Sequence, residues 1–172
     1  AGWQAGEPWG VEVRLPADFD YSQTELATRR SSQAWAAQGV RATDGEALPA
    51  LGKASILTPA GARGPAFLVG GNYRVILRYN TATSYALAVG TLSRRVAGEP
   101  GIRADWPHQE TPLSRAQVRE LQRSLNARGF ATGTPDGIMG PNTRAGLRAF
   151  QAAQGLTPDG FATVSLLERL QQ

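Results

Sequence analysis

Thr134-Pro-Asp-Gly137 is a four-residue turn sequence that occurs again, unchanged, at Thr157-Pro-Asp-Gly160. Proline presets φ at the first central position of a tight turn, aspartate bonds its own backbone, and glycine accepts a positive φ. Each turn therefore stops one segment and delivers the chain into the next. Because apolar residues recur at helical spacing around both turns, the pair predicts three short helices joined by two similar turns.

The stretch before the first turn carries the signals of both ends of a helix. Ser114 is a good N-cap, and Gln117, three residues later, completes a capping box. Val118, Leu121 and Leu125 then follow on one face. A glycine at position 129 is placed to end this helix.

Two further helices are expected after the first turn. One begins near Asn142-Thr143 and ends at Gly155, and the last runs toward the C-terminus. Their expected core residues are Ala145, Leu147, Phe150, Val164, Leu166, Leu167 and Leu170. A core of this size is too small to hold a deep catalytic pocket, so residues 113–172 are expected to bind rather than to catalyse.

Residues 98–112 are rich in glycine, proline and acids and have no hydrophobic period, which predicts a linker. We therefore expect domains at 1–98 and 113–172, with 99–112 as the linker. His108, the only histidine, lies in this linker and is interpreted as solvated. With one histidine and no cysteine, the chain offers no set of zinc ligands, and we expect neither a metal nor a cofactor.

Residues 1–98 mix strand and helix patterns, which predicts an α+β fold. Residues 8–15 alternate apolar and polar side chains as a half-buried strand does, and 54–58 and 66–69 predict two more short strands. A helix is expected over residues 26–38, with Trp35 as its bulky apolar contact.

Two more helices are expected at the end of this half, one around residues 73–79 and one over 83–98. Tyr85, Ala88 or Val89, Leu92 and Val96 form the expected buried stripe of the second helix. Both helices are apolar on more than one face, which suits burial inside a larger body. The chain also begins at Ala1-Gly2-Trp3, with neither a methionine nor a signal peptide. We therefore expect a missing N-terminal portion.

The charge pattern excludes little and, taken alone, does not decide the function. The net charge is +4, and arginine supplies 17 of the 18 basic residues. There is no basic run and no basic patch interleaved with aromatic residues, so nucleic acid is not an expected partner. A mildly basic surface suits other polyanions.

A set of residues with specific spacing extends over nearly all of 113–172. It consists of Leu121-Gln122, Leu125, Gly129, Asp136-Gly137, Gly140, Thr143, Ala145, Phe150-Gln151, Gly155-Leu156 and Asp159-Gly160. This set resembles the peptidoglycan-binding domain found at the ends of many bacterial wall enzymes. The resemblance implies a three-helix module that holds an enzyme against peptidoglycan without cutting it.

A second set of residues lies within 1–98. It consists of Gly2-Trp3, Gly6-Glu-Pro-Trp-Gly10, Val13, Leu15-Pro16, Phe19-Asp20, Trp35, Gly39-Val40, Asn72-Tyr-Arg-Val-Ile-Leu-Arg-Tyr-Asn80, Ser84-Tyr-Ala86 and Ala88-Val89. This set resembles the C-terminal part of a lytic murein transglycosylase of the B type. The resemblance implies a small β subdomain and the closing helices of a lysozyme-like catalytic domain.

The same resemblance implies a reaction and a location. Such enzymes cut between N-acetylmuramic acid and N-acetylglucosamine and leave a 1,6-anhydro end, using a single carboxylic acid. The family's catalytic glutamate sits in a Glu-Ser-type motif N-terminal to this region, and no such motif occurs here. Glu7, Glu12, Glu25 and Glu46 match no catalytic position, so this chain alone is expected to be inactive. Glycan strands and the missing N-terminal portion are the expected partners, in the periplasm or cell envelope.

For the site residues, a structural and a functional interpretation stand side by side. Tyr79-Asn80 corresponds to a pair that lines the glycan cleft in the family, although asparagine is also a common helix terminator. Tyr85 is assigned to substrate binding, although its position suits a core stripe. Asp136 and Asp159 are assigned to the wall-binding module, although each is explained as a turn-former.

Thr143, Arg144 and Arg148 are expected to be exposed on the second helix of the module and to meet wall carbohydrate or stem peptide. The competing function is a non-catalytic wall-anchoring protein that uses both halves for binding. A wall amidase or peptidase is disfavoured, because it needs zinc ligands or a Cys-His pair.

Overall fold

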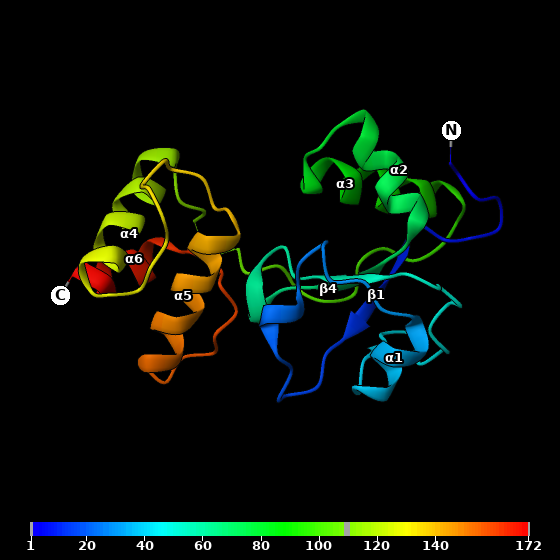
Figure 1. Ribbon diagram of the computed structural model, residues 1–172. Helices are drawn as coiled ribbons and strands as arrows, with labels where there is room; N and C mark the ends of the chain where they lie inside the picture. The colour runs from blue at the N-terminus through cyan, green and yellow to red at the C-terminus, as the bar shows by residue number, and fades with distance from the viewer. Residues whose placement is uncertain (1, 109–110, 172) are drawn as a thin grey trace. The chain divides into compact units, whose positions relative to one another are not determined.

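The computed structural model describes residues 2–108 and 111–171 and divides after Trp106 into two compact units, Ala1–Trp106 and Pro107–Gln172 (Figure 1). Each unit has its own hydrophobic core. The domain ends expected at residues 1 and 172, and linker residues 109 and 110, lie outside the described residues.

A four-stranded antiparallel sheet forms the middle of the first unit. Its spatial order is β2 (Arg41–Ala42), β1 (Gly10–Arg14), β4 (Ala66–Val69) and β3 (Ser55–Leu57). Val13 lies opposite Ala42 on one side and Ala66 on the other. The three expected strands are therefore confirmed, and the α+β class with them. The two-residue strand β2 has too short an apolar pattern to be expected.

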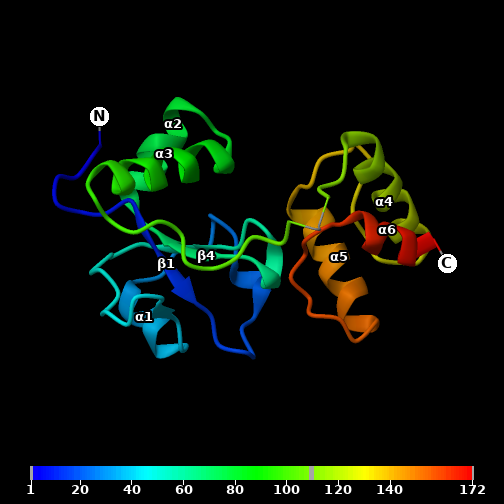
Figure 2. The same cartoon turned by 180° about the vertical axis from the view of Figure 1, so that it is seen from behind.

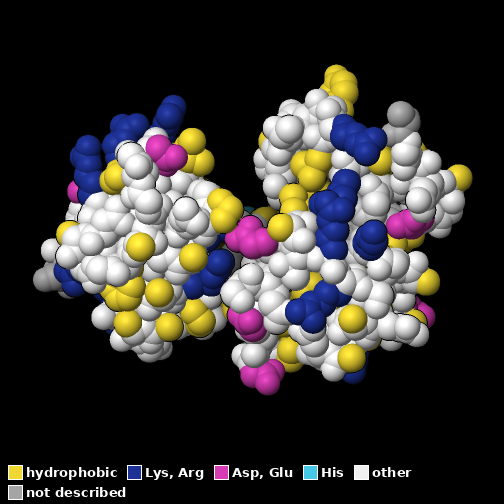
Figure 3. All heavy atoms as spheres, viewed as in Figure 1, with side chains coloured by type: hydrophobic (Ala, Val, Ile, Leu, Met, Phe, Trp, Pro, Cys, Tyr) yellow, Lys and Arg dark blue, Asp and Glu magenta, His cyan; other side chains and the backbone are white. Residues whose placement is uncertain are grey.

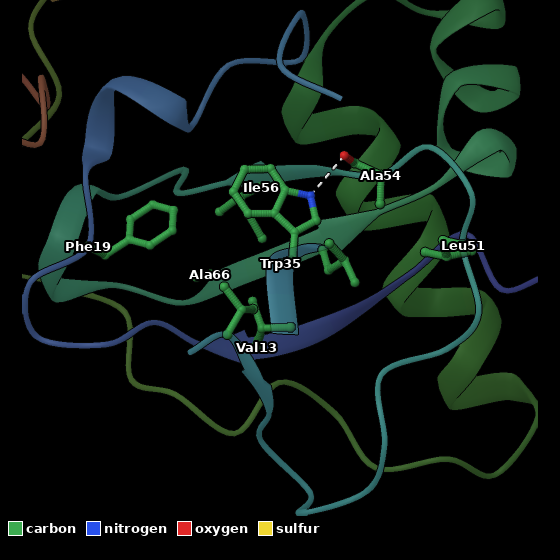
Figure 4. Close-up of a cluster of buried hydrophobic side chains, with 9 residues drawn as sticks. Val13, Phe19, Trp35, Leu51, Ala54, Ile56 and Ala66 are labelled. Atoms are coloured by element: carbon green, nitrogen blue, oxygen red, sulfur yellow. Dashed lines mark hydrogen bonds between the residues drawn. The ribbon is translucent and has the colours of Figure 1, made fainter. Parts of the chain in front are cut away.

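One face of the sheet packs against the short helix α1 (Ser32–Ala37). Trp35 is fully buried there among Val13, Ile56 and Leu68. Its indole Nε1 donates a hydrogen bond to the Ala54 carbonyl at 3.0 Å, as Figure 4 shows. The one polar atom of a large buried ring is thus satisfied. The expected role of Trp35 is confirmed.

The helix expected over 26–38 begins only at Ser32, so its first half was wrong. Ser31 caps the helix through its Oγ, which accepts from the Ala34 N–H. The residues before it are held by tertiary hydrogen bonds instead: Arg30 and Ala54 exchange backbone hydrogen bonds, and the Leu26 carbonyl accepts from Arg74. Tertiary bonds outweigh helix propensity in this segment.

Helices α2 (Gly71–Tyr79) and α3 (Thr83–Val96) cover the opposite face of the sheet, which Figures 1 and 2 show from two sides. Trp9 lies between Phe67 and Tyr73, with ring centroids 6.3 and 6.1 Å away. Where α3 meets Trp9 it carries Gly90, and a Cβ there would lie 2.5 Å from the Trp9 ring. α3 therefore approaches the indole more closely than a side chain would allow.

The buried residues of α3 are Ala86, Leu87 and Gly90. The expected buried stripe through Tyr85, Ala88 or Val89, Leu92 and Val96 was therefore wrong. Leu92 is 63% exposed and Val96 81% exposed. The close contact of Gly90 with Trp9, rather than the count of apolar residues, selects the face that α3 turns to the sheet.

After α3 the chain returns across the sheet in a segment that we call the strap, residues 99–104 (Figure 2). The carboxylate of Glu12 in β1 accepts hydrogen bonds from the backbone N–H of Arg103 at 2.7 Å and of Ala104 at 2.8 Å. Ile102 packs against the cluster that contains Trp9. The strap was expected as linker and is instead bound to the first unit, because a buried acid satisfies its backbone.

The second unit consists of α4 (Arg115–Ala127), α5 (Pro141–Ala153) and α6 (Val164–Gln171), as expected. The capping box at Ser114 and Gln117 is present. Gly129 and Gly155, at φ +84° and +67°, follow the first two helices in the left-handed conformation that favours glycine. Leu121, Leu125, Leu147, Phe150, Leu166, Leu167 and Leu170 are buried together.

Ala145 was expected in this core and is exposed. The position next to it, Gly146, faces inward instead. A Cβ at Gly146 would lie 2.9 Å from the Thr132 side chain and 3.0 Å from the Ala131 carbonyl. The loop before α5 thus packs directly on the helix backbone at the glycine, which turns Ala145 to solvent.

Candidate functional site

Tyr79, Asn80 and Tyr85 lie together at the corner between α2 and α3. The Tyr79 side chain is 84% exposed, and its ring stacks on that of Tyr85 with centroids 6.0 Å apart and planes 28° from parallel. Tyr85 is half-buried. The pair presents an apolar ring surface with hydroxyl groups at its edges, a combination that suits a ligand with both apolar and hydrogen-bonding faces.

Asn80 ends α2, as the structural interpretation expected. Its backbone N–H donates to the Ile76 carbonyl, and its side-chain Oδ1 accepts from the Ala82 N–H at 2.9 Å. The Nδ2 group makes no hydrogen bond within the described part of the chain. Asn80 therefore fixes the corner with one side-chain atom and keeps a donor for a ligand with the other.

The buried residue Tyr73 stabilises the corner between α2 and α3. Its hydroxyl donates to the Thr83 carbonyl at 3.1 Å, which ties α2 to the first residue of α3. Burial raises the pKa of Tyr73 to about 12, and an interaction with the Thr83 side chain opposes this only in part. The Tyr73 phenol therefore stays neutral and keeps its hydrogen bond to Thr83. This bond holds together the two helices that carry Tyr79 and Tyr85.

Basic side chains gather on the face of the first unit that Figure 3 shows. Arg74 on α2 donates to the Leu26 carbonyl at 2.6 Å and to Ser55 Oγ at 2.7 Å. Burial lowers the pKa of Arg74, and the nearby positive charge of Arg29 lowers it further. The sign of this surface suits an anionic ligand.

The acid that is most buried in the first unit, Glu12, has a structural use, because its two oxygens bind the strap. Among the described residues, no cluster of three histidine, cysteine or acidic side chains is placed to hold a metal ion. The same residues include no helix long and apolar enough to cross a membrane. His108 is exposed, as expected.

In the second unit, each Thr-Pro-Asp-Gly turn is held by one buried glutamine. Gln122 Nε2 donates to Asp136 Oδ1 at 2.9 Å, and its Oε1 accepts from the Gly137 N–H at 2.8 Å. Gln151 makes the same two bonds to Asp159 and Gly160, at 2.7 and 2.8 Å. We call each set a Gln-Asp-Gly clamp.

Each aspartate of a clamp also closes its own turn. Asp136 Oδ1 accepts from the Ile138 N–H, and Asp159 Oδ1 accepts from the Phe161 N–H. The hydrogen bond from Gln122, and after it the one from Ile138, holds the pKa of Asp136 below its usual range. These contacts support the turn-forming interpretation of both aspartates.

Thr143 was expected on the surface and is only 2% exposed. Its Oγ accepts from Gln122 Nε2 at 2.9 Å and donates to the Ile138 carbonyl at 3.2 Å. The first clamp therefore draws Thr143 inward. Arg144 and Arg148, on the same helix, are half-buried, and the Arg148 side chain lies against the Gly160 backbone.

Two structural roles escaped the sequence analysis. The burial of Gln122 and Gln151 was not predicted, and the two residues entered only as part of the family spacing. Each directly follows a core residue, Leu121 or Phe150, at a position where an exposed helix face would be expected. The bond between Glu12 and the strap spans 91 residues and has no local signal.

Comparison with known families assigns both units. Residues 1–94 match the transglycosylase SLT domain family, and residues 114–170 match a peptidoglycan binding domain family. The chain belongs to the transglycosylase SLT domain family. The resemblances found in the sequence are thereby confirmed. Comparison with curated protein sequences gave no match.

This SLT-family chain is also similar to solved structures of SltB3 from Pseudomonas aeruginosa. In the crystal structure of SltB3 with NAG-anhNAM-pentapeptide, the TM-score is 0.94 and the identity 50% over 99% of this chain. In the crystal structure of SltB3 with NAG-NAM-pentapeptide, the TM-score is 0.93 and the sequence identity is 51% over 98% of this chain. The chain spans 46% of the SltB3 chain in both.

The SLT match contains the corner at Tyr79, Asn80 and Tyr85, and the second match contains both clamps together with Arg144 and Arg148. The strap falls between the two matched regions, although it is bound to the first unit. The candidate residues of this SLT-family chain are therefore divided between the two matched regions, the corner in one and the clamps with Arg144 and Arg148 in the other.

Proposed function

We propose that this chain is the C-terminal portion of a lytic transglycosylase that cleaves MurNAc–GlcNAc strands of peptidoglycan and leaves 1,6-anhydro-MurNAc ends. The observation that carries the proposal is the likeness to SltB3, at 50% identity over nearly the whole chain. The second unit holds the enzyme to the wall. The enzyme works in the periplasm or cell envelope, where its substrate is.

The proposed reaction needs one carboxylic acid. It first gives its proton to the leaving glycosidic oxygen as the C1–O bond breaks, and the resulting carboxylate then takes the proton of the sugar's own 6-hydroxyl as the new C1–O6 bond forms. We place this acid in a portion that precedes the chain. Glu12 is already bonded to the strap, which supports assigning the acid elsewhere.

The corner supplies binding rather than acid catalysis. Asn80 directly follows Tyr79, whose ring stacks on Tyr85, and its Nδ2 donor is proposed to bind a sugar oxygen. The exposed apolar side chains of Tyr79, Leu92 and Val96 on these helices support a preceding portion of the enzyme as the neighbour of this face.

On the second unit, we assign wall contact to Arg144 and Arg148. Both lie on α5 beside the clamps, and arginine binds the carboxylates of stem peptides well. Asp136, Asp159 and Thr143 shape the surface around them through the hydrogen bonds of the clamps.

The proposal is tested by comparing this chain with the longer protein that contains it. Both are expected to sediment with insoluble peptidoglycan, and only the longer protein is expected to release 1,6-anhydro-muropeptides, detected by mass spectrometry. Product release by the chain alone would place the acid within it. A longer protein that binds but releases nothing would instead indicate a wall-anchoring protein without catalysis.

The role of the corner is tested by Asn80→Asp in the longer protein. Aspartate keeps the oxygen that accepts from Ala82 but loses the Nδ2 donor. We expect turnover to fall about tenfold, as loss of one ligand hydrogen bond implies, with an unchanged melting temperature. Full activity of this variant would show that Asn80 caps the helix and does not bind the substrate.

A further inference from the structure

A cavity of about 480 Å³ opens on the first unit, at the end of β1 and beside the strap. The turns η1 (Tyr21–Gln23) and η2 (Gly61–Arg63) contribute Tyr21, Gly61 and Ala62 to its wall. Thr43 and Thr58 add hydroxyl groups. A volume in this range suits a peptide segment or a small molecule.

The charged residues that line the cavity are Arg14 and Arg103. No aspartate or glutamate is among the described residues of its wall. Neither arginine makes a hydrogen bond or ion pair through its side chain within the described part of the chain, and both residues are exposed. The cavity therefore carries two positive charges without a counter-charge on its wall.

Strand β1 and the strap position these two arginines. Glu12 and Arg14 are two positions apart on β1, so their side chains leave the same face of the strand. Glu12 binds the strap at Arg103 and Ala104, which brings the residue that carries the second guanidinium to the wall that Arg14 lines. The Glu12 carboxylate accepts its two hydrogen bonds from backbone N–H groups, and the residue is only 7% exposed.

We propose that this cavity binds a carboxylate of a peptide, namely the stem peptide of peptidoglycan, through Arg14 and Arg103. This inference rests on the proposed function for the identity of the peptide. Guanidinium groups bind carboxylates with paired, charge-assisted hydrogen bonds, and the hydroxyl group of Thr58 on the same wall can donate one more. All the residues that line the site belong to the first unit and do not include the corner at Tyr79, and the site recognises the peptide rather than the glycan.

The test measures binding of soluble NAG-NAM-pentapeptide to the full chain by calorimetry, with free carboxylates or with the same carboxylates converted to amides. Arg14→Gln and Arg103→Gln are each expected to weaken binding of the free acid about tenfold, since a charge-assisted bond is lost. Neither variant should change binding of the amide. Lys53→Gln, an exposed charge on the same unit outside the cavity, is the matched control.

Equal binding by wild type and both arginine variants overturns the cavity assignment, and so does equal affinity for acid and amide. Acetate and inorganic phosphate are titrated in parallel, and a response to these ions as strong as to the peptide would mean a general anion site. Sedimentation with insoluble peptidoglycan is measured on the same preparations. A chain that binds the free acid through these arginines but does not sediment overturns the proposed function and leaves the cavity assignment standing.

Discussion

Protonation of Asp136 would weaken the bonds that hold the first turn, because its Oδ1 accepts from both Gln122 and Ile138. These bonds stabilise the ionised carboxylate, so the pKa of Asp136 in the folded chain lies below its usual range. A group with a lowered folded pKa adds stability above its unfolded pKa. That stability is lost as pH falls through the folded value.

We therefore predict that the second unit loses stability below about pH 4, the region where an unfolded aspartate titrates. In Asp136→Asn, the amide oxygen still accepts both bonds but no longer titrates, so its unfolding midpoint should depend less on pH. Urea unfolding of both proteins, followed by helical circular dichroism between pH 5 and 2, measures the difference. Parallel pH profiles would contradict the assignment to Asp136.

The structural roles of single residues were predictable from the sequence where the decisive contact is local. Ser114 and Gln117 bond to each other within one helical turn, so the capping box was predictable. Thr143 was misplaced because its burial depends on Gln122, which lies 21 residues away. The donor of Asn80 could be suspected from the family resemblance, whereas its cap role followed from the residue type alone.

Among the elements, α3 shows how one small residue can select a helix face. An alanine in place of Gly90 would normally stabilise a helix by about 1 kcal/mol. Here the added Cβ would lie 2.5 Å from a rigid indole, and neither the ring nor the helix can move without disturbing the other. Overpacking of this kind costs about 1–3 kcal/mol.

We predict that Gly90→Ala lowers the stability of the first unit by about 1 kcal/mol, against the trend of helix propensity. Tryptophan fluorescence reports on this unit alone, because Trp3, Trp9, Trp35 and Trp106 all belong to it. Gly52→Ala is the control, since nothing lies within 4 Å of its added Cβ. A gain in stability for Gly90→Ala would show that α3 does not depend on this contact.

The helix α1 differs from α4 in how far its limits follow from sequence. The beginning of α4 is set by its own capping box. The residues before α1 have a helical pattern but bond to Ala54 and Arg74, and these tertiary bonds keep them out of the helix. Sequence periodicity identified both helices, and only the structure could show where tertiary bonds shorten one of them.

For the whole molecule, the important boundary is the one between the two units. Composition placed the end of the first domain at residue 98, yet the first unit continues to Trp106. The reason is chemical: the buried Glu12 carboxylate accepts hydrogen bonds from the backbone N–H groups of Arg103 and Ala104 in the strap. An unpaired buried charge is costly, so the strap and β1 stabilise each other.

We predict that a chain ending at residue 106 is more stable than one ending at residue 98 by about 2–3 kcal/mol, the value of hydrogen bonds to a buried charge together with the packing of Ile102. Glu12→Gln should lower stability by about 2 kcal/mol in the longer chain, because an amide can accept only one of the two N–H bonds without repulsion. In the chain that ends at 98, the same substitution should have no cost, because the bonds to the strap are already lost. Thermal unfolding of the four proteins closes this double-mutant cycle, and additive effects of truncation and substitution would mean that the strap and Glu12 act independently.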